Sequence, residues 1–292
     1  MVKNPEVSVC VPAYQAERYL AGTLRSVLAQ SFRNFELVVV DNASTDRTAE
    51  ILRQFDDPRL RVVRNRAVLP VADNWNRAVA ESRAPLVKLL CADDLLHPRC
   101  LEWQHAVLTR DPGLALVCGR RTMVNEESRP MSRNRGLRGL LGRHASEDVV
   151  RRVVRHGGNP LGEPAAALFR RLDFDAVGGF DGRWKFPMDL ALWVRLLERG
   201  DFYGMRQSVA AFRISRGSLS DALDDTGYAE QRRLTGEIAG TPEWRVRKRD
   251  RLVGAAKAPS ARLRRQALFV VARAQGRRTD RDVTATADHP EE

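Results

Sequence analysis

Two adjacent carboxylates, Asp93 and Asp94, follow an apolar run at residues 86–91, and Pro98 then opens the next element. Two acids at the mouth of a buried strand are costly to desolvate unless a cation meets them. Mg²⁺ is usually bound by one or two carboxylates together with phosphate oxygens and water. The pair therefore indicates either a divalent metal that holds a diphosphate or a cap on the helix that begins near Pro98. This segment alone favours neither interpretation.

Hydrophobic periodicity predicts the elements that position these acids. Over the first 120 residues, short apolar runs alternate with stretches whose apolar residues recur at helical spacing. Near-continuous apolar strands separated by helices indicate a parallel sheet that is covered on both faces. The expected strands are residues 7–12, 35–41, 60–63, 86–91 and 114–118, and the expected helices are residues 16–30, 44–55, 72–82 and 99–110.

Three of these strands end in polar or acidic residues. In open α/β sheets, ligands bind beyond the carboxyl ends of the strands. The strand ends Pro12-Ala13-Tyr14, Asp41-Asn42-Ala43 and Asp93-Asp94 would therefore meet at one edge of the sheet and form a nucleotide site. A dinucleotide site is not expected, because the turn at residues 12–17 has no glycine, and a Walker A loop is absent as well.

The second half of the chain predicts a different mixture of elements. Residues 122–142 are rich in Arg, Gly and Ser and are expected to form a mobile loop. Gly178-Gly179 is expected to end a short helix at residues 172–177. Further helices are expected at residues 147–155, 189–199 and 221–238, strands at residues 165–169 and 202–212, a basic helical region after Gly240, and a frayed end from about residue 279.

The 292-residue chain carries a net charge of +12, and the basic excess is uneven. Residues 244–278 contain twelve Lys or Arg and one acid, Asp250. This block is interpreted as a solvated helix face or as a contact with an anionic membrane surface or an acidic acceptor. Nucleic acid is not an expected partner, because neither an aromatic-interleaved basic groove nor a nucleic-acid motif accompanies the charge.

Several features predict a cytoplasmic protein, with peripheral contact at the inner face of the membrane as an open alternative. The sequence has neither an apolar run of about 18 residues nor the pattern of a signal peptide. Its four cysteines show no C-x-x-C spacing, and Cys10, Cys91 and Cys118 lie in apolar runs. They are therefore expected to be buried free thiols rather than disulfides or zinc ligands.

Five segments in order resemble the motifs of the family 2 glycosyltransferases, which have the GT-A fold. Residues 7–14 resemble the opening strand and nucleotide-binding turn, and residues 36–46 resemble the strand with the "DDGSTD" element. Residues 91–94 resemble the D-x-D metal motif. Residues 177–181 and 188–193 resemble the acceptor-side segment that carries the catalytic base. The resemblance covers about residues 5–220.

The resemblance implies a role for each matching residue. Asp41 would accept the imide N–H of a uracil or thymine ring. Asp93 would hold a divalent metal, Mg²⁺ or Mn²⁺, that bridges the diphosphate, and Asp94 would contribute to this metal site or bind a donor-sugar hydroxyl. Asp189 would be the general base that takes the proton of the acceptor hydroxyl. The residues expected along the nucleotide sugar are Pro12, Ala13, Tyr14, Glu17, Asp41, Asn74, Asp93, Asp94 and Arg213.

Alternatives remain open for several of these positions. Asp41 could cap its strand end and Asp189 could cap a helix, while Arg213 and Arg216 could form surface salt bridges instead of contacting phosphate. Asn74 and Asn76 could each serve the N-terminus of a helix, and Trp184 could stack on an acceptor ring or pack locally. The chain departs from the family pattern with Cys91 for the first Asp of D-x-D, Met188 before the base, and Ser215 for a His.

These observations predict an α/β fold, a GT-A-type single domain with a mostly parallel central sheet flanked by helices. Residues 1–240 would form this domain, with a nucleotide-binding half at 1–120 and an acceptor-binding half at 121–240, and residues 241–292 a basic helical extension. The expected reaction is metal-assisted, inverting transfer from a nucleotide-diphospho-sugar, with UDP- or dTDP-sugars favoured. The acceptor would be a saccharide, a lipid-linked intermediate or a small natural product. A sugar nucleotidyltransferase and a non-catalytic nucleotide-sugar-binding scaffold are the competing hypotheses.

Overall fold

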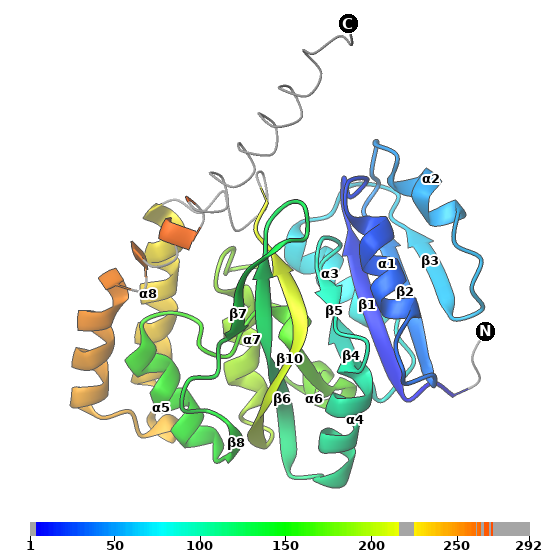
Figure 1. Cartoon of the computed structure of the whole chain (residues 1–292). Coiled ribbons are helices and arrows are strands. Elements are labelled where there is room, and N and C mark those ends of the chain that lie inside the picture. Colours follow the sequence, from blue (N-terminus) through cyan, green and yellow to red (C-terminus); the bar gives the residue numbers. More distant parts are fainter. Residues whose placement is uncertain (1–3, 216–224, 261, 264–265, 269, 271–292) are drawn as a thin grey trace, which may run out of the picture.

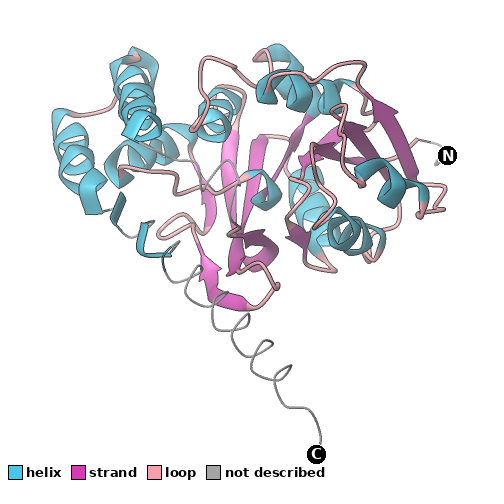
Figure 2. Ribbon diagram, turned by 90° about the horizontal axis from the view of Figure 1, so that it is seen from above, coloured by secondary structure: helices cyan, strands magenta, loops and turns pink. Residues whose placement is uncertain are grey.

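The computed structural model describes residues 4–215, 225–260, 262–263, 266–268 and 270. Its described strands form one ten-stranded sheet, in the order β3-β2-β1-β4-β9-β6-β10-β5, with β7 paired to β6 and β8 paired to β10. Helices lie on both sides of this sheet (Figures 1 and 2). The α/β class predicted from the sequence is confirmed, and the sheet is mixed.

The N-terminal part of the sheet is parallel. β1 (Val7–Ala13) pairs in parallel with β2 (Phe35–Asp41) on one side and with β4 (Leu86–Leu89) on the other, and β3 (Leu60–Arg64) extends the sheet beyond β2. Every residue of β1, β2 and β4 is buried, which explains their near-continuous apolar runs. Because Ala13 is paired with Asp41, the carboxyl ends of β1 and β2 lie side by side, as predicted.

The other part of the sheet is mixed. β9 (Ala167–Arg170) lies between β4 and β6 (Leu114–Val124) and is antiparallel to both. β10 (Asp201–Arg213) runs parallel to β6 along most of its length. The short strand β5 (Leu95–Leu96) pairs with the end of β10. This pairing places the Asp93-Asp94 turn beside the carboxyl end of β10.

Residues 122–142, expected to be a mobile loop, are instead largely structured. They contain the end of β6, the antiparallel strand β7 (Pro130–Arg135), and the first residue of β8 (Gly142–His144). Leu137 and Leu140 are fully buried. The mobile-loop prediction is wrong because strand pairing satisfies the backbone N–H and C=O groups of this polar segment. Local composition does not reveal that pairing.

Two helical layers cover the two faces of the sheet. Successive residues of a strand face opposite sides, so Val38 and Val40 pack against one layer while Leu37 and Val39 pack against the other. The second layer holds α1 (Leu20–Leu28), α2 (Thr48–Arg53) and α4 (Cys100–Arg110). The first layer holds α3 (Val71–Ala80), α5 (Ser146–His156), α6 (Arg171–Ala176), α7 (Met188–Leu196) and α8 (Asp225–Gly240), with the 3-10 turn η2 (Pro242–Trp244) beside it. The 3-10 turn η1 (Pro164–Ala166) precedes β9, and its Ala165 packs with the second layer.

Most helices predicted from periodicity are present with shorter bounds. α1 begins at Leu20 rather than Ala16, because residues 14–19 form the loop beyond β1. α6 ends before Gly178 and Gly179, which have φ of 78° and 68° and thus make the left-handed turn that the sequence predicted. The predicted start of the α8 helix at Asp221 lies outside the described residues, as do Arg216 and the frayed end from residue 279.

In the C-terminal extension, the 3-10 turn η2 is followed by a helix that is described from residue 248 to residue 260, and residues 262–263, 266–268 and 270 are helical as well. Within the described part of the chain, no helix is long and apolar enough to cross a membrane. All four cysteines are free, as predicted. Cys91 is half-buried and lies beyond β4, which ends at Leu89, so its placement inside the strand is corrected.

Candidate active site

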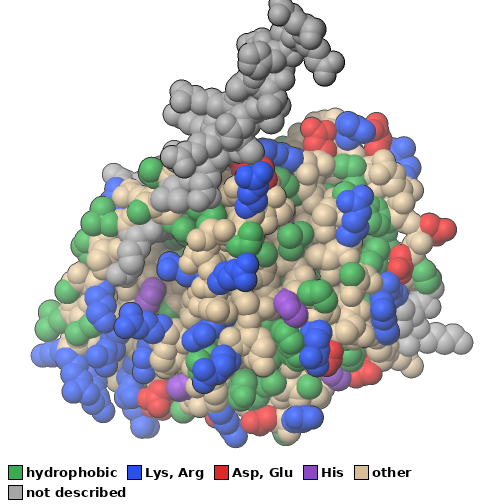
Figure 3. All heavy atoms as spheres, viewed as in Figure 1, with side chains coloured by type: hydrophobic (Ala, Val, Ile, Leu, Met, Phe, Trp, Pro, Cys, Tyr) green, Lys and Arg blue, Asp and Glu red, His purple; other side chains and the backbone are tan. Residues whose placement is uncertain are grey.

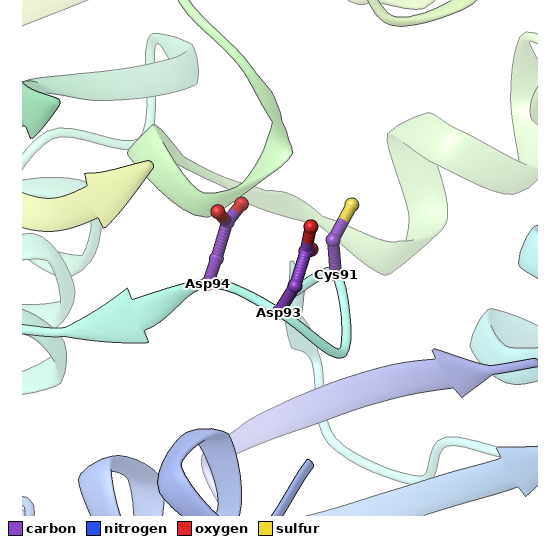
Figure 4. A group of neighbouring side chains, drawn as sticks. All are labelled: Cys91, Asp93 and Asp94. Atoms are coloured by element: carbon purple, nitrogen blue, oxygen red, sulfur yellow. The ribbon is translucent and has the colours of Figure 1, made fainter. Parts of the chain in front are cut away.

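The turn between β4 and β5 brings three potential metal ligands together. Sγ of Cys91 and one carboxylate oxygen each of Asp93 and Asp94 all lie within 4.8 Å of one another. Figure 4 shows the three side chains projecting to the same side of this turn. Asp94 is fully buried, whereas Asp93 and Cys91 are half-buried. We call these three residues the acidic turn.

The acidic turn does not cap α4. That helix begins at Cys100, its N-cap residue is Arg99, and β5 separates it from Asp94. Asp94 Oδ1 accepts a hydrogen bond from the backbone N–H of Arg213 at 2.9 Å, but Asp94 Oδ2 is buried with no hydrogen-bond partner among the described residues. The capping interpretation is therefore wrong, and Asp94 Oδ2 is left to bind a cation.

Burial makes the acids of this turn costly to ionise. Desolvation raises the pKa of Asp94 well above its usual range, and the neighbouring charge of Asp93 raises it further. Desolvation also raises the pKa of Asp93. A divalent cation at this point would reverse both effects, because an opposite charge favours the ionised form. The residues present therefore fit a metal of the kind that the D-x-D resemblance implies.

Arg213, at the end of β10, holds the acidic turn in place. Its Nε donates to the carbonyl oxygen of Asp93 at 2.8 Å. Its Nη1 donates to the carbonyl oxygens of Asn125 and Glu126 and to Ser128 Oγ, each at 3.0 Å. The guanidinium also lies over the ring of Tyr19, 4.3 Å from its centroid. Arg213 is only 3% exposed, so it does not form the surface salt bridge considered from the sequence.

The loop after β1 is tied to the loop after β2. Backbone N–H groups of Gln15 and Ala16 donate to hydroxyl oxygens of Ser44 and Thr48, at 3.1 and 2.9 Å. Glu17 both donates its N–H to Asp46 and accepts the N–H of Arg47. Pro12 and Ala13 are buried in β1, whereas the Tyr14 side chain is 52% exposed at the sheet edge. The predicted nucleotide-binding turn is thus rigidly placed, with Tyr14 accessible to a ligand.

Asp41 ends β2 with its carboxylate already engaged on two sides. Oδ1 accepts the backbone N–H of Ser44 at 3.0 Å, and Oδ2 is ion-paired with Arg64. Arg64 also donates to the carbonyl oxygen of Ser44. Strand-end capping of Asp41 is therefore real. A carboxylate can accept about four hydrogen bonds, so this engagement leaves capacity for a ligand.

Buried amides fill the space behind Asp41. Asn65 Nδ2 donates to Asn42 Oδ1 at 2.6 Å and to Asn74 Oδ1 at 3.0 Å. Asn74 therefore lies at the predicted nucleotide edge, in the first turn of α3. Asn76 has a different task, because its side-chain amide both donates to the carbonyl oxygen of Phe180 and accepts its N–H. The amide of Asn76 thus links α3 to the loop that leads toward Asp189.

Asp189 lies in the first turn of α7 and is not the N-cap, which is Pro187. Its Oδ1 accepts the N–H of Leu190 at 2.7 Å, and its Oδ2 accepts a hydrogen bond from Asn159 Nδ2 at 2.9 Å. The charge of Asp189 contributes to raising the pKa of Cys91. Trp184, in the preceding loop, is 2% exposed and packs locally, so stacking on an acceptor ring is not supported.

A model of glycosyl transferase family 2 matches residues 8–178, more than half of the chain. The chain belongs to glycosyl transferase family 2. It is therefore a transferase enzyme, as the D-x-D and "DDGSTD" resemblances implied.

Relatives in the family support this assignment. The uncharacterized protein MT1568 of Mycobacterium tuberculosis (strain CDC 1551 / Oshkosh) is 33% identical over 206 residues, which cover 67% of this chain and 63% of the relative. EpsE of Bacillus subtilis (strain 168), named as a glycosyltransferase, is 27% identical, covering 75% of this chain and 76% of its own. The Escherichia coli UDP-Glc:alpha-D-GlcNAc-diphosphoundecaprenol beta-1,3-glucosyltransferase WfgD is 28% identical over 122 residues, 42% of this chain and 48% of its own.

Solved structures of the GT-A type share the fold. TarS of S. aureus (residues 1–349), in complex with UDP-GlcNAc, aligns over 86% of this chain and 71% of its own with a TM-score of 0.63 and 19% identity. The mannosyltransferase PcManGT of Pyrobaculum calidifontis, in complex with GDP-Man and Mn²⁺, aligns over 94% and 81% with a TM-score of 0.57 and 18% identity. These similarities confirm the predicted GT-A fold.

Three residues of this family 2 site were not predicted from the sequence. Asn159 contacts Asp189, while Glu163 is ion-paired with Arg121 and its charge acts on Asp94 and Cys91. Asn159 and Glu163 flank Gly162 in a short irregular segment, where neither periodicity nor a motif marks them. Arg64 could have been found, because it also ends a strand of the parallel part of the sheet.

Proposed function

We propose that this family 2 enzyme transfers a sugar from a UDP-sugar to an acceptor hydroxyl with inversion, assisted by a divalent metal. The observation that carries the proposal is Asp94 Oδ2, which is buried and has no hydrogen-bond partner in the part of the chain that the structure describes. It lies in a turn at the same sheet edge as Asp41. The family membership establishes glycosyl transfer, and the donor, the metal and the stereochemistry are inferred from these residues. Residues 1–120 would hold the nucleotide and residues 121–240 the acceptor, with residues 241–292 as an extension.

The Asp41–Arg64 pair supports a base that carries an imide. It presents a carboxylate acceptor beside a guanidinium donor. Uracil and thymine place an N–H between two carbonyl oxygens, so one edge of either ring would meet both groups, whereas cytosine offers a bare ring nitrogen to the carboxylate. Exposed Tyr14 would cover the base or ribose. The UDP-GlcNAc complex of TarS agrees with a uridine donor, and we favour UDP over dTDP on that ground.

Asp93 and Asp94 are the residues that would hold Mn²⁺ or Mg²⁺. The bound metal would supply positive charge that offsets the negative charge developing on the nucleoside diphosphate. Arg213 keeps the carbonyl of Asp93 and the carboxylate of Asp94 in register for this task. Since the guanidinium already donates to protein carbonyls, we infer that Arg213 acts through the acidic turn, in addition to the nucleotide contact expected from the sequence.

Asp189 would act as general base. Its carboxylate would take the proton from the acceptor hydroxyl while that oxygen attacks the anomeric carbon from the face opposite the leaving diphosphate. A single displacement of this kind inverts the anomeric configuration. Asn159 holds Oδ2 of Asp189 and the Leu190 N–H holds Oδ1, so the direction of the carboxylate is fixed before the acceptor binds.

For the acceptor, we favour a lipid-linked saccharide. WfgD is named for a diphosphoundecaprenol acceptor. Lys and Arg side chains gather on one side of this chain, over α5 and the helix at residues 248–260, at the lower left of Figure 3. Arg245, Arg247, Lys248 and Arg249 are exposed there, and such a surface is complementary to anionic lipid. We therefore also propose peripheral membrane contact through residues 244–278, argued from the residues of that range that the structure describes.

The test uses the full chain with Mn²⁺, first against a panel of nucleotide sugars by thermal shift, because a ligand that binds the native state raises its melting temperature. The donor so identified is then incubated with membrane extract carrying lipid-linked saccharides, and nucleoside diphosphate release is measured. We expect release that Asp189→Asn abolishes while donor binding persists. Binding without any release by the wild type would favour the non-catalytic scaffold, and binding restricted to adenine or cytosine nucleotides would refute the donor assignment.

A further inference from the structure

Cys91 is the chain's distinctive feature at the metal site. Cys10, Cys100 and Cys118 are fully buried in the core, whereas Cys91 is half-buried beside Asp93 and Asp94 (Figure 4). Its thiol stands at the position where the family 2 pattern has the first carboxylate of D-x-D. A thiolate carries the same single negative charge as that carboxylate but is a much softer ligand.

The geometry allows all three side chains to reach one ion. Zinc–sulfur bonds are about 2.3 Å and zinc–carboxylate bonds about 2.0–2.2 Å, so ligand atoms on one tetrahedral zinc ion lie roughly 3.4–3.6 Å apart. The ligand atoms of the acidic turn lie within 4.8 Å of one another. A contraction of at most about 1.4 Å, within reach of side-chain rotation, would bring all three onto one cation.

A second observation points independently to a cation. Asp94 Oδ2 is completely buried and has no hydrogen-bond partner among the described residues, although it belongs to this same group. A buried carboxylate oxygen without a donor costs free energy unless a ligand satisfies it. Arg213 does not serve this purpose, because its backbone N–H bonds the other oxygen and its Nε bonds the Asp93 carbonyl.

We propose that Cys91 Sγ is a third protein ligand of this metal site, which therefore prefers thiophilic divalent cations such as Zn²⁺ over Mg²⁺. The inference rests on the proposed metal-assisted function. On binding, the Sγ–H bond breaks, the metal–sulfur bond forms, and the proton leaves to solvent. No electron transfer is involved. The sulfur selects the cation, since Mg²⁺ takes hard oxygen ligands while thiolate favours softer ions.

The experiment titrates Cd²⁺ into the full chain without nucleotide and follows the sulfur-to-cadmium charge-transfer absorption, which carboxylates alone do not produce. Cys91→Ser is compared with Cys100→Ser, a matched control whose thiol is fully buried against Gln104. We expect the band in wild type and Cys100→Ser. In Cys91→Ser the band should be lost and Cd²⁺ affinity should fall at least about tenfold, with Mg²⁺ affinity little changed, since a lost ligand costs at least as much as a lost outer-shell partner.

The outcomes separate this inference from the function on which it rests. A band of equal strength in Cys91→Ser overturns the assignment of sulfur. The assignment is also overturned if the wild type shows no band while its Mn²⁺ binding, measured by calorimetry, still depends on Asp93. That result leaves the proposed metal-assisted function intact. If neither metal binds, both proposals fail. Cys91→Asp, which restores the family pattern, covers the case of a misfolded Cys91→Ser, and it should shift the preference toward Mg²⁺.

Discussion

Replacing Arg213 by Met should destabilise the acidic turn, and the size of the loss in stability follows from the contacts of the Arg213 side chain. Arg213→Met keeps a long apolar side chain and removes the Nε and Nη1 donors that bond Asp93, Asn125, Glu126 and Ser128. A hydrogen bond to a charged group is worth about 1.5–3 kcal/mol, but such bonds are not additive within one network. The desolvation cost of the guanidinium is also recovered in the variant.

Removing one partner from a buried charged network typically costs about 3–5 kcal/mol, and we expect a loss of that size here. At roughly 2–4 °C per kcal/mol for domains of 150–250 residues, the melting temperature should fall by about 6–20 °C. Mn²⁺ affinity should fall by about tenfold or more, as when other outer-shell partners of metal ligands are removed. Both effects should appear in the protein without nucleotide.

The assay combines denaturant unfolding with calorimetric titration of Mn²⁺ into the nucleotide-free protein. Arg129→Met, an exposed arginine on the same β6–β7 connection, is the matched control and should behave as wild type. If Arg213→Met keeps wild-type stability and Mn²⁺ affinity and loses only affinity for nucleoside diphosphate, Arg213 is a phosphate ligand and the reasoning from its buried contacts is refuted.

Three further predictions concern other residues. Asn159→Ala should lower kcat about 10–100-fold with little change in the KM for the donor, since Asn159 orients Asp189 without touching the donor. Steady-state kinetics measure both constants, and an equal loss in donor binding would contradict the prediction. Arg64→Ala should weaken UDP binding by at least about tenfold, because one charged hydrogen bond of about 1.5–3 kcal/mol is lost, and it should not strengthen ADP binding. Titration calorimetry measures both affinities, and an unchanged UDP affinity would contradict the prediction. Burial lowers the pKa of Lys88 in the folded state below the 10.5 of a free lysine, so the unfolded chain binds more protons at pH values between the two pKa values. In that pH window, the free energy of unfolding of the wild type relative to Lys88→Met should therefore rise with pH. Denaturant unfolding at several pH values checks the sign, and a difference that does not change with pH would contradict the prediction.

Much of the nucleotide-binding part could be predicted because its signals are local. Val7–Ala13 and Phe35–Asp41 are mostly apolar and buried throughout, and parallel strands in register bring Ala13 and Asp41 together at the sheet edge, as predicted. The order of the neighbouring strands could not be predicted. β9 enters the sheet beside β4 from a segment about 80 residues later, and no local pattern in Ala167–Arg170 specifies that partner.

The parts of the site that the sequence did not reveal depend on long-range contacts. Arg213 was placed near the diphosphate by resemblance, but its hydrogen-bond partners lie at residues 93 and 125–128, in two separate loops. Asn159 meets Asp189 thirty residues away. The β7 strand was missed because an exposed edge strand with Arg133 and Asn134 lacks the apolar alternation that predicts a strand.

The central claim is a metal-dependent site for a uridine nucleotide sugar, and the most direct test is calorimetric titration of UDP with Mn²⁺ and with a chelator. We predict that removing the metal, or replacing Asp93 by Asn, weakens UDP binding at least about tenfold, the lower bound for disrupting a metal's ligand set. UDP binding of equal affinity in all three conditions, or absent in all three, would contradict it.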